Sequence, residues 1–138
     1  IFAAGNVLHV HDLVDWVTEE SEIAGKGIAD YLNNNRKRRK NTLKLQAGDN
    51  LNYVIPNKID FKDDERNFIK LFMRVSKPLT DVKIHLIYKD DILLKFDKDF
   101  ALPGEMLTIN LPEKIISENM KEIKISVKKK EGEGIYEK

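Results

Sequence analysis

The side chains best suited to chemistry lie together near the start of the chain. His9 and His11 are two positions apart, so their imidazoles would share one face of an extended loop. An imidazole can act as a general acid or base, or as a metal ligand. Asp12 and Asp15 are the accompanying carboxylates that have a metal-ligand spacing, and the chain has no cysteine. These residue types indicate a polar functional loop and only weakly favour a metal site.

Two backbone elements would position this loop. Residues 1–4 are apolar and predict the end of a buried strand. Gly5-Asn6 follows and predicts a turn at which the main chain can approach a neighbour closely. From residue 12 to residue 32, apolar and small side chains recur at steps of three and four, which predicts a long helix.

The helix carries its own start and stop signals. Asp12 is expected to cap the first amides, and the acidic first half suits the positive end of the helix dipole. Gly25 and Gly27 cost about 1 kcal/mol each in a helix interior, so they indicate close packing against another backbone. Three asparagines from Asn33 onward tolerate the left-handed conformation that ends many helices.

The first quarter of the chain resembles a known family. The run FAAGNVLHVHDLVD, residues 2–15, is similar to the C-terminal FAD-contacting segment of the pyridine nucleotide-disulfide oxidoreductase superfamily. More narrowly, it looks like the FAD-dependent oxidoreductases associated with bacterial glycerol and amine metabolism. The resemblance implies that this segment is the last part of an FAD-binding domain.

The resemblance also implies roles for individual residues. Gly5 would let the main chain approach the ribityl and phosphate part of FAD, and the next residue would hydrogen-bond there. That residue is usually Asp in the superfamily, whereas Asn6 can make the hydrogen bond without a negative charge. Leu13, Val14 and Asp15 would direct free amides at the flavin ring and stabilise the reduced anion.

The family places the rest of the enzyme upstream of this chain. The Gly-rich nucleotide-binding loops and any redox cysteines would lie there, so the missing N-terminal FAD/NAD(P)-binding domain is the expected partner. We expect FAD as the cofactor of the full-length parent, with NAD(P) as a second nucleotide. His9 and His11 then become loop residues beside the cofactor, and we expect neither a catalytic side chain nor a metal ligand in this chain. Its apolar start is interpreted as a cut through a longer sequence.

Composition narrows the classes of partner and compartment. The 24 basic and 23 acidic side chains give a net charge of +1, which favours neither nucleic acid nor an anionic membrane. The basic run at residues 36–40 lacks interleaved aromatics, so we interpret it as a solvated linker. Without cysteine or a long apolar run, the chain is expected to be cytoplasmic, with no nucleic-acid or membrane partner.

After Asn41 the apolar period drops to two, and turn signals separate short segments. The pattern predicts a mainly β fold, a seven-stranded immunoglobulin- or fibronectin-like β-sandwich of antiparallel strands. An antibody-like domain is not supported, because the region has neither Trp nor a Cys pair. The expected strands are residues 42–47, 51–55, 67–75, 81–88, 92–97, 105–111 and 122–128.

The expected organisation has four parts. Residues 1–35 form the C-terminal piece of the FAD/NAD(P)-binding domain, 36–41 the linker, 42–130 the sandwich and 131–138 a flexible tail. Our leading hypothesis is the C-terminal fragment of a flavin-dependent, NAD(P)-linked oxidoreductase, whose sandwich caps the enzyme or meets a partner subunit or a second copy. The rival is a non-enzymatic immunoglobulin-like interaction module with a helical N-terminal arm.

Overall fold

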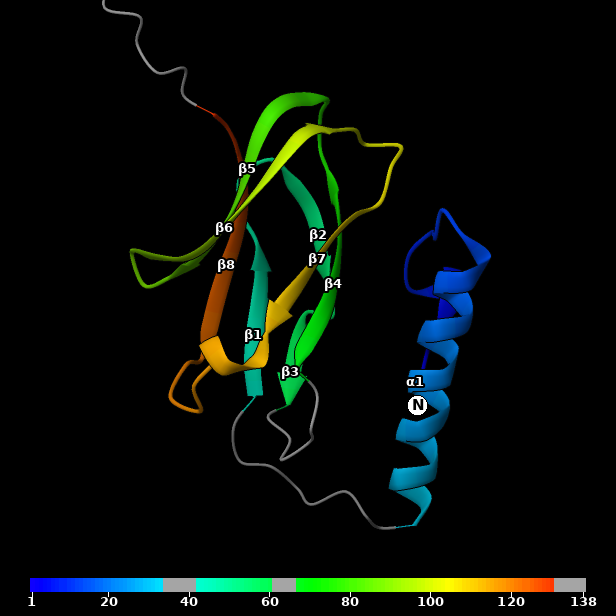
Figure 1. The fold of residues 1–138 in the computed structure, drawn as a ribbon. Coiled ribbons are helices and arrows are strands. Elements are labelled where there is room, and N and C mark those ends of the chain that lie inside the picture. The colour runs from blue at the N-terminus through cyan, green and yellow to red at the C-terminus, as the bar shows by residue number, and fades with distance from the viewer. Residues whose placement is uncertain (34–41, 61–66, 131–138) are drawn as a thin grey trace, which may run out of the picture. The chain divides into compact units, whose positions relative to one another are not determined.

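The computed structural model describes residues 1–33, 42–60 and 67–130. The chain divides into two compact units, Ile1–Lys40 and Asn41–Lys138 (Figure 1). The predicted linker at residues 36–41 and the predicted tail at 131–138 lie outside the described residues.

The first unit consists of a short 3₁₀ helix, η1 (Gly5–Val7), and the long helix α1 (Val14–Leu32). The helix begins two residues later than predicted, with Leu13 as an extended N-cap residue. The expectation that Asp12 is the N-cap residue is therefore wrong: Leu13 holds that position, and its side chain makes no capping hydrogen bond. The helix ends at Leu32 with Asn33 as its C-cap residue, where the sequence predicted the end. The next position, Asn34, at which a left-handed residue would follow the cap, lies outside the described residues.

Residues 1–4 do not form the predicted strand end. They are assigned to no regular element, and the described part of this unit holds no second strand with which they could pair. A strand depends on hydrogen bonds to a neighbour, so an apolar run alone does not make one.

The first unit leaves much of its apolar surface exposed. None of the 19 residues of α1 is buried. The exposed large apolar side chains of this unit are Ile1, Phe2, Val7, Leu8, Val10, Leu13, Val14, Ile23, Ile28, Tyr31 and Leu32. An amphipathic helix is stabilised mainly by covering its apolar face, so α1 gains little from its own unit.

The second unit is a β-sandwich, which confirms the mainly β fold preceded by one long helix (Figure 1). Its described residues form a five-stranded sheet in the order β3-β1-β8-β5-β6 and a three-stranded sheet in the order β2-β4-β7. The strands are β1 (Thr42–Ala47), β2 (Leu51–Ile55), β3 (Lys58–Asp60), β4 (Phe68–Val75), β5 (Leu79–Tyr88), β6 (Asp91–Ala101), β7 (Leu107–Pro112) and β8 (Glu122–Lys129).

Two features of the sandwich differ from the prediction. The short strand β3 was not predicted, because only Ile59 of its three residues is buried and a single apolar residue shows no alternation. In addition, β1 and β8 pair in parallel, whereas the other strand pairs of the described residues are antiparallel. A sequence pattern shows which face of a strand is buried but not which strand lies beside it.

The core of the sandwich lies between the inward faces of the two sheets. The alternation predicted in β5 is observed, since Val82, Ile84 and Leu86 are all fully buried. Other fully buried side chains include Leu43, Leu71, Met73, Leu111, Ile123 and Ile125. The turn after β1 is tied to β8, because Asn50 Nδ2 donates to the carbonyl of Val127 at 2.7 Å.

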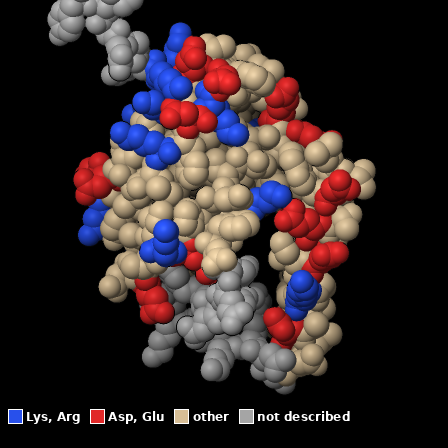
Figure 2. Space-filling view, in the orientation of Figure 1, with Lys and Arg blue, Asp and Glu red and all other residues tan. Residues whose placement is uncertain are grey.

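The surface carries both signs of charge. Figure 2 shows Lys and Arg interleaved with Asp and Glu on the visible face of the sandwich. In the part of the chain that the structure describes, no helix has both the length and the apolar character needed to cross a membrane.

Candidate functional site

The carboxylate of Glu20 brings the two N-terminal histidines together. Nε2 of His9 lies 3.3 Å from Oε1 of Glu20, and Nε2 of His11 lies 3.0 Å from Oε2. Glu20 lies in α1, whereas both histidines lie in the loop before this helix. The loop therefore folds back along the helix, so that two imidazoles meet one carboxylate.

The two imidazoles are enclosed by their own unit. The side chains of His9 and His11 are only 1% and 0% exposed, whereas that of Glu20 is 14% exposed. The two rings also pack on each other, with their centroids 4.1 Å apart. Most of the large apolar side chains of this unit are exposed, whereas His9 and His11 are buried. The buried side chains of the unit are therefore mainly polar and need hydrogen-bond partners.

Glu20 also holds the turn that precedes the histidines. The backbone N–H of Gly5 donates to Oε2 of Glu20 at 2.5 Å. Gly5 is buried and has a φ of +72°, a conformation that favours glycine. A Cβ at this position would lie 3.3 Å from Cγ1 of Val17. Gly5 is therefore required both by the backbone conformation and by the close approach to α1.

Asn6 fixes the other end of the same loop. Its Oδ1 accepts a hydrogen bond from the backbone N–H of His11 at 3.2 Å. Because this contact uses the acceptor of the side-chain amide, its Nδ2 group is the part that can donate to a ligand. The side chain of Asn6 itself is exposed.

The other residues expected to contact a cofactor lie at the start of α1. Leu13 is the N-cap residue, and Val14 and Asp15 open the first turn, where all three are exposed. The N–H of Trp16 donates to the carbonyl of Leu13 at 3.2 Å. The structure thus places all five expected cofactor residues in one small unit, with Gly5 against Val17 just after this turn.

The sequence interpretation missed Glu20, the residue that organises the site. Only Asp12 and Asp15 were considered as carboxylates, because they are close to the histidines in sequence. Glu20 follows Val17 by three positions and therefore shares its helix face. A prediction that Gly5 packs against that face would have identified Glu20 as a partner of the loop.

His85 lies in the second unit and has a different environment. It stands on β5, and neither of its ring nitrogens has a hydrogen-bond partner among the described residues. Burial lowers the pKa of His85, and the positive charges of Lys128, Lys95 and Lys83 lower it further. A neutral histidine among lysines, without a nearby carboxylate ligand, has the features of a structural position in the sheet.

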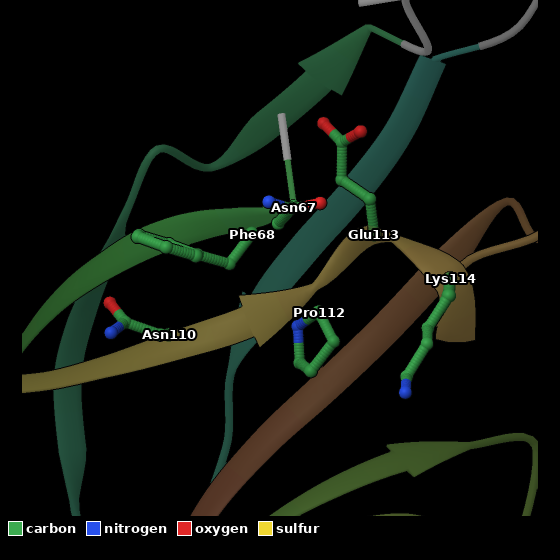
Figure 3. Close-up of a pocket in the computed structure, with 6 residues that line it drawn as sticks. All are labelled: Asn67, Phe68, Asn110, Pro112, Glu113 and Lys114. Atoms are coloured by element: carbon green, nitrogen blue, oxygen red, sulfur yellow. The ribbon is translucent and has the colours of Figure 1, made fainter. Parts of the chain in front are cut away.

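A shallow hollow of about 460 Å³ lies beside the start of β4 and the end of β7 in the sandwich (Figure 3). It is lined by Asn67, Phe68, Asn110, Pro112, Glu113 and Lys114. Its walls combine one carboxylate and one amine with an exposed Phe68 ring. These groups form neither a nucleophile and base pair nor a set of metal ligands, so the hollow does not indicate catalysis.

Comparison with protein-family models, with curated proteins and with solved structures yields no match. The functional interpretation therefore depends on the residues of the first unit and on their geometry.

Proposed function

We propose that the first unit is the last FAD-contacting segment of a flavin-dependent, NAD(P)-linked oxidoreductase of the cytoplasm. FAD is the cofactor of the full-length parent protein, whose nucleotide-binding domain precedes this unit. The β-sandwich acts as a domain that caps the enzyme or contacts a partner subunit.

The observation that carries this proposal is the Gly5-Asn6 turn, which lies in η1 and is followed by the loop that leads into α1. Gly5 has a positive φ, and its N–H donates to Glu20, so the conformation of the main chain is defined at this point. Because glycine has no side chain, no side chain of its own covers the main chain there. A bare main chain of this kind can approach a ribityl chain or a phosphate closely. Asn6 is exposed, and its Nδ2 group can supply a donor to the same ligand.

The start of α1 supplies the electrostatic part of the proposal. The N-cap residue Leu13 makes no side-chain capping hydrogen bond, and Leu13, Val14 and Asp15 are exposed. The N-terminus of a helix carries about half a positive charge. Placed beside the flavin ring, it stabilises the negative charge that develops on the ring when the flavin is reduced. The backbone of this segment, not a catalytic side chain, favours the reduced cofactor.

The exposed apolar side chains of α1 support a larger parent protein. Val14, Ile23, Tyr31 and Leu32 are each more than half exposed. A helix with this surface is expected to pack against further protein, and the remainder of an FAD-binding domain would provide it.

The test is expression of the parent protein, including the sequence upstream of Ile1. We expect one FAD per chain, an oxidised-flavin absorption spectrum that bleaches on reduction with NADH or NADPH, and a Gly-x-Gly-x-x-Gly motif after an upstream strand. A parent that folds but binds no flavin would refute the proposal. It would leave the rival, an interaction module whose exposed helix binds another protein.

A further inference from the structure

We propose that His9, His11 and Glu20 form a binding site for a divalent transition metal ion, of which Zn²⁺ fits the ligands best. This site goes beyond the proposed flavin contact and does not depend on it. It also revises the expectation that this chain contains no metal ligand, because Glu20, and not Asp12 or Asp15, is the carboxylate that joins the two histidines.

The spacing of the three side chains fits a single ion. One ligand atom from each residue lies within 4.8 Å of the other two. The two nitrogen-to-oxygen distances are 3.3 and 3.0 Å. Zinc bonds to nitrogen and oxygen are about 2.0–2.1 Å long, so neighbouring ligands of a tetrahedral ion lie about 3.3 Å apart. An ion can therefore enter the cluster after small side-chain shifts.

The chemistry of the ligands selects the class of metal. Two imidazoles and one carboxylate suit Zn²⁺, Co²⁺ or Ni²⁺, whereas Ca²⁺ and Mg²⁺ prefer sites built from oxygen. Three protein ligands leave a fourth position for water. The partly exposed carboxylate of Glu20 marks the side from which solvent reaches the ion, since both histidine side chains are enclosed.

The surrounding hydrogen bonds hold the ligands in position. The N–H of Gly5 donates to the Glu20 carboxylate, and the side chain of Asn6 accepts from the backbone of His11. The first contact orients a ligating carboxylate, as the outer partners of metal ligands do, and the second fixes the backbone that carries His11. A bound ion would cross-link the loop to α1 and so stabilise the first unit, because metal binding contributes directly to folding.

The ordinary alternative is a hydrogen-bonded cluster in which both imidazoles donate Nε2–H to Glu20. The two arrangements differ in what occupies Nε2. In the hydrogen-bonded cluster a proton stays on each Nε2, whereas in a metal site the ion replaces it. The imidazole nitrogens can therefore be observed directly to distinguish them.

The experiment uses the 138-residue chain, freed of metal and titrated with Zn²⁺ by calorimetry and with Co²⁺ by visible absorption. We expect one saturable equivalent and the absorption bands of a four- or five-coordinate Co²⁺ ion. In ¹⁵N-labelled protein, Zn²⁺ should shift the Nε2 resonances of His9 and His11 but not those of His85. Mg²⁺ should not compete.

Variants then assign the ligands. His11→Ala should abolish saturable binding, and Glu20→Gln, which keeps a hydrogen-bond acceptor but loses the anionic ligand, should weaken it at least tenfold. Glu22→Gln is the matched control on the exposed face of α1, and His85→Ala is the control for unspecific histidine binding; both should bind as wild type.

Three results would overturn the metal site. These are no saturable binding of Zn²⁺, wild-type binding by His11→Ala, and Nε2 resonances of His9 and His11 that do not shift when Zn²⁺ is added to the wild-type chain. The last measurement needs no variant, so it decides the question even if His11→Ala does not fold. No flavin is present in these experiments, so failure of the metal site leaves the flavin proposal standing, and the reverse also holds.

Discussion

Replacing Glu20 with Ala should release the loop from helix α1. The carboxylate accepts the N–H of Gly5 at 2.5 Å and lies 3.3 and 3.0 Å from the imidazoles of His9 and His11. A hydrogen bond to a charged group contributes about 1.5–3 kcal/mol, and we take about 1 kcal/mol for each of the three because Glu20 is partly exposed. The free energy of opening this loop should therefore fall by about 3 kcal/mol, which corresponds to about a 100-fold increase in the opening equilibrium.

Amide hydrogen exchange followed by NMR measures this opening at single residues. The amides of Gly5 and His11 should exchange about 100-fold faster in metal-free Glu20→Ala than in the metal-free wild type. Glu22→Ala removes a carboxylate from an exposed position two residues away and should leave both rates unchanged. Equal exchange of the Gly5 amide in Glu20→Ala and the wild type would refute the claim that Glu20 holds the loop.

Three further predictions concern the two units separately. Gly25→Ala should stabilise α1 by about 0.5–1 kcal/mol in this chain, as measured by helix exchange rates, because a Cβ there meets nothing within 4 Å; a loss of stability would contradict this. Gly48→Ala should destabilise the sandwich by about 1–3 kcal/mol in urea unfolding, because the new Cβ would overlap Oγ of Ser126; unchanged stability would show that this turn relaxes freely. The lowered pKa of His85 means that its contribution to stability is complete above about pH 6.5 and is lost as the pH falls toward the folded-state pKa. The free energy of unfolding should therefore fall less between about pH 7 and about pH 5 in His85→Gln than in the wild type, and identical pH profiles would exclude His85 as the cause.

The sandwich was predictable because a two-residue period directly reports which face of a strand is buried. Ile84 and Leu86 in β5, like Ile123 and Ile125 in β8, alternate with polar residues and are fully buried. The register between strands was not predictable, since it depends on which buried faces meet in the folded chain. The parallel pairing of Leu45 with Ile123 joins residues far apart in sequence, and no local pattern encodes it.

The loop of the candidate site was only partly predictable. The requirement for glycine at position 5 could be inferred from the turn, and the structure gives it a positive φ. The role of Glu20 could not, because it depends on how the loop folds back against α1. The start of α1 was placed too early, since Asp12 has the side chain of a helix cap, but the backbone becomes helical only after Leu13.

The central claim is that the Gly5-Asn6 turn contacts FAD, and substitutions of Asn6 in the full-length parent test it most directly. Asn6→Ala removes a side chain that is exposed and lies outside the core, so it should weaken FAD binding about tenfold through the loss of about 0.5–1.5 kcal/mol. Asn6→Asp keeps an acceptor for the N–H of His11 but loses the Nδ2 donor, so it should weaken FAD binding at least as much as Asn6→Ala does. Lys83→Ala in the sandwich should leave binding unchanged. The measurement is the dissociation constant of FAD for each purified protein. A loss of about tenfold in both Asn6 variants, with wild-type affinity in Lys83→Ala, supports the contact, whereas wild-type affinity in Asn6→Ala would contradict it.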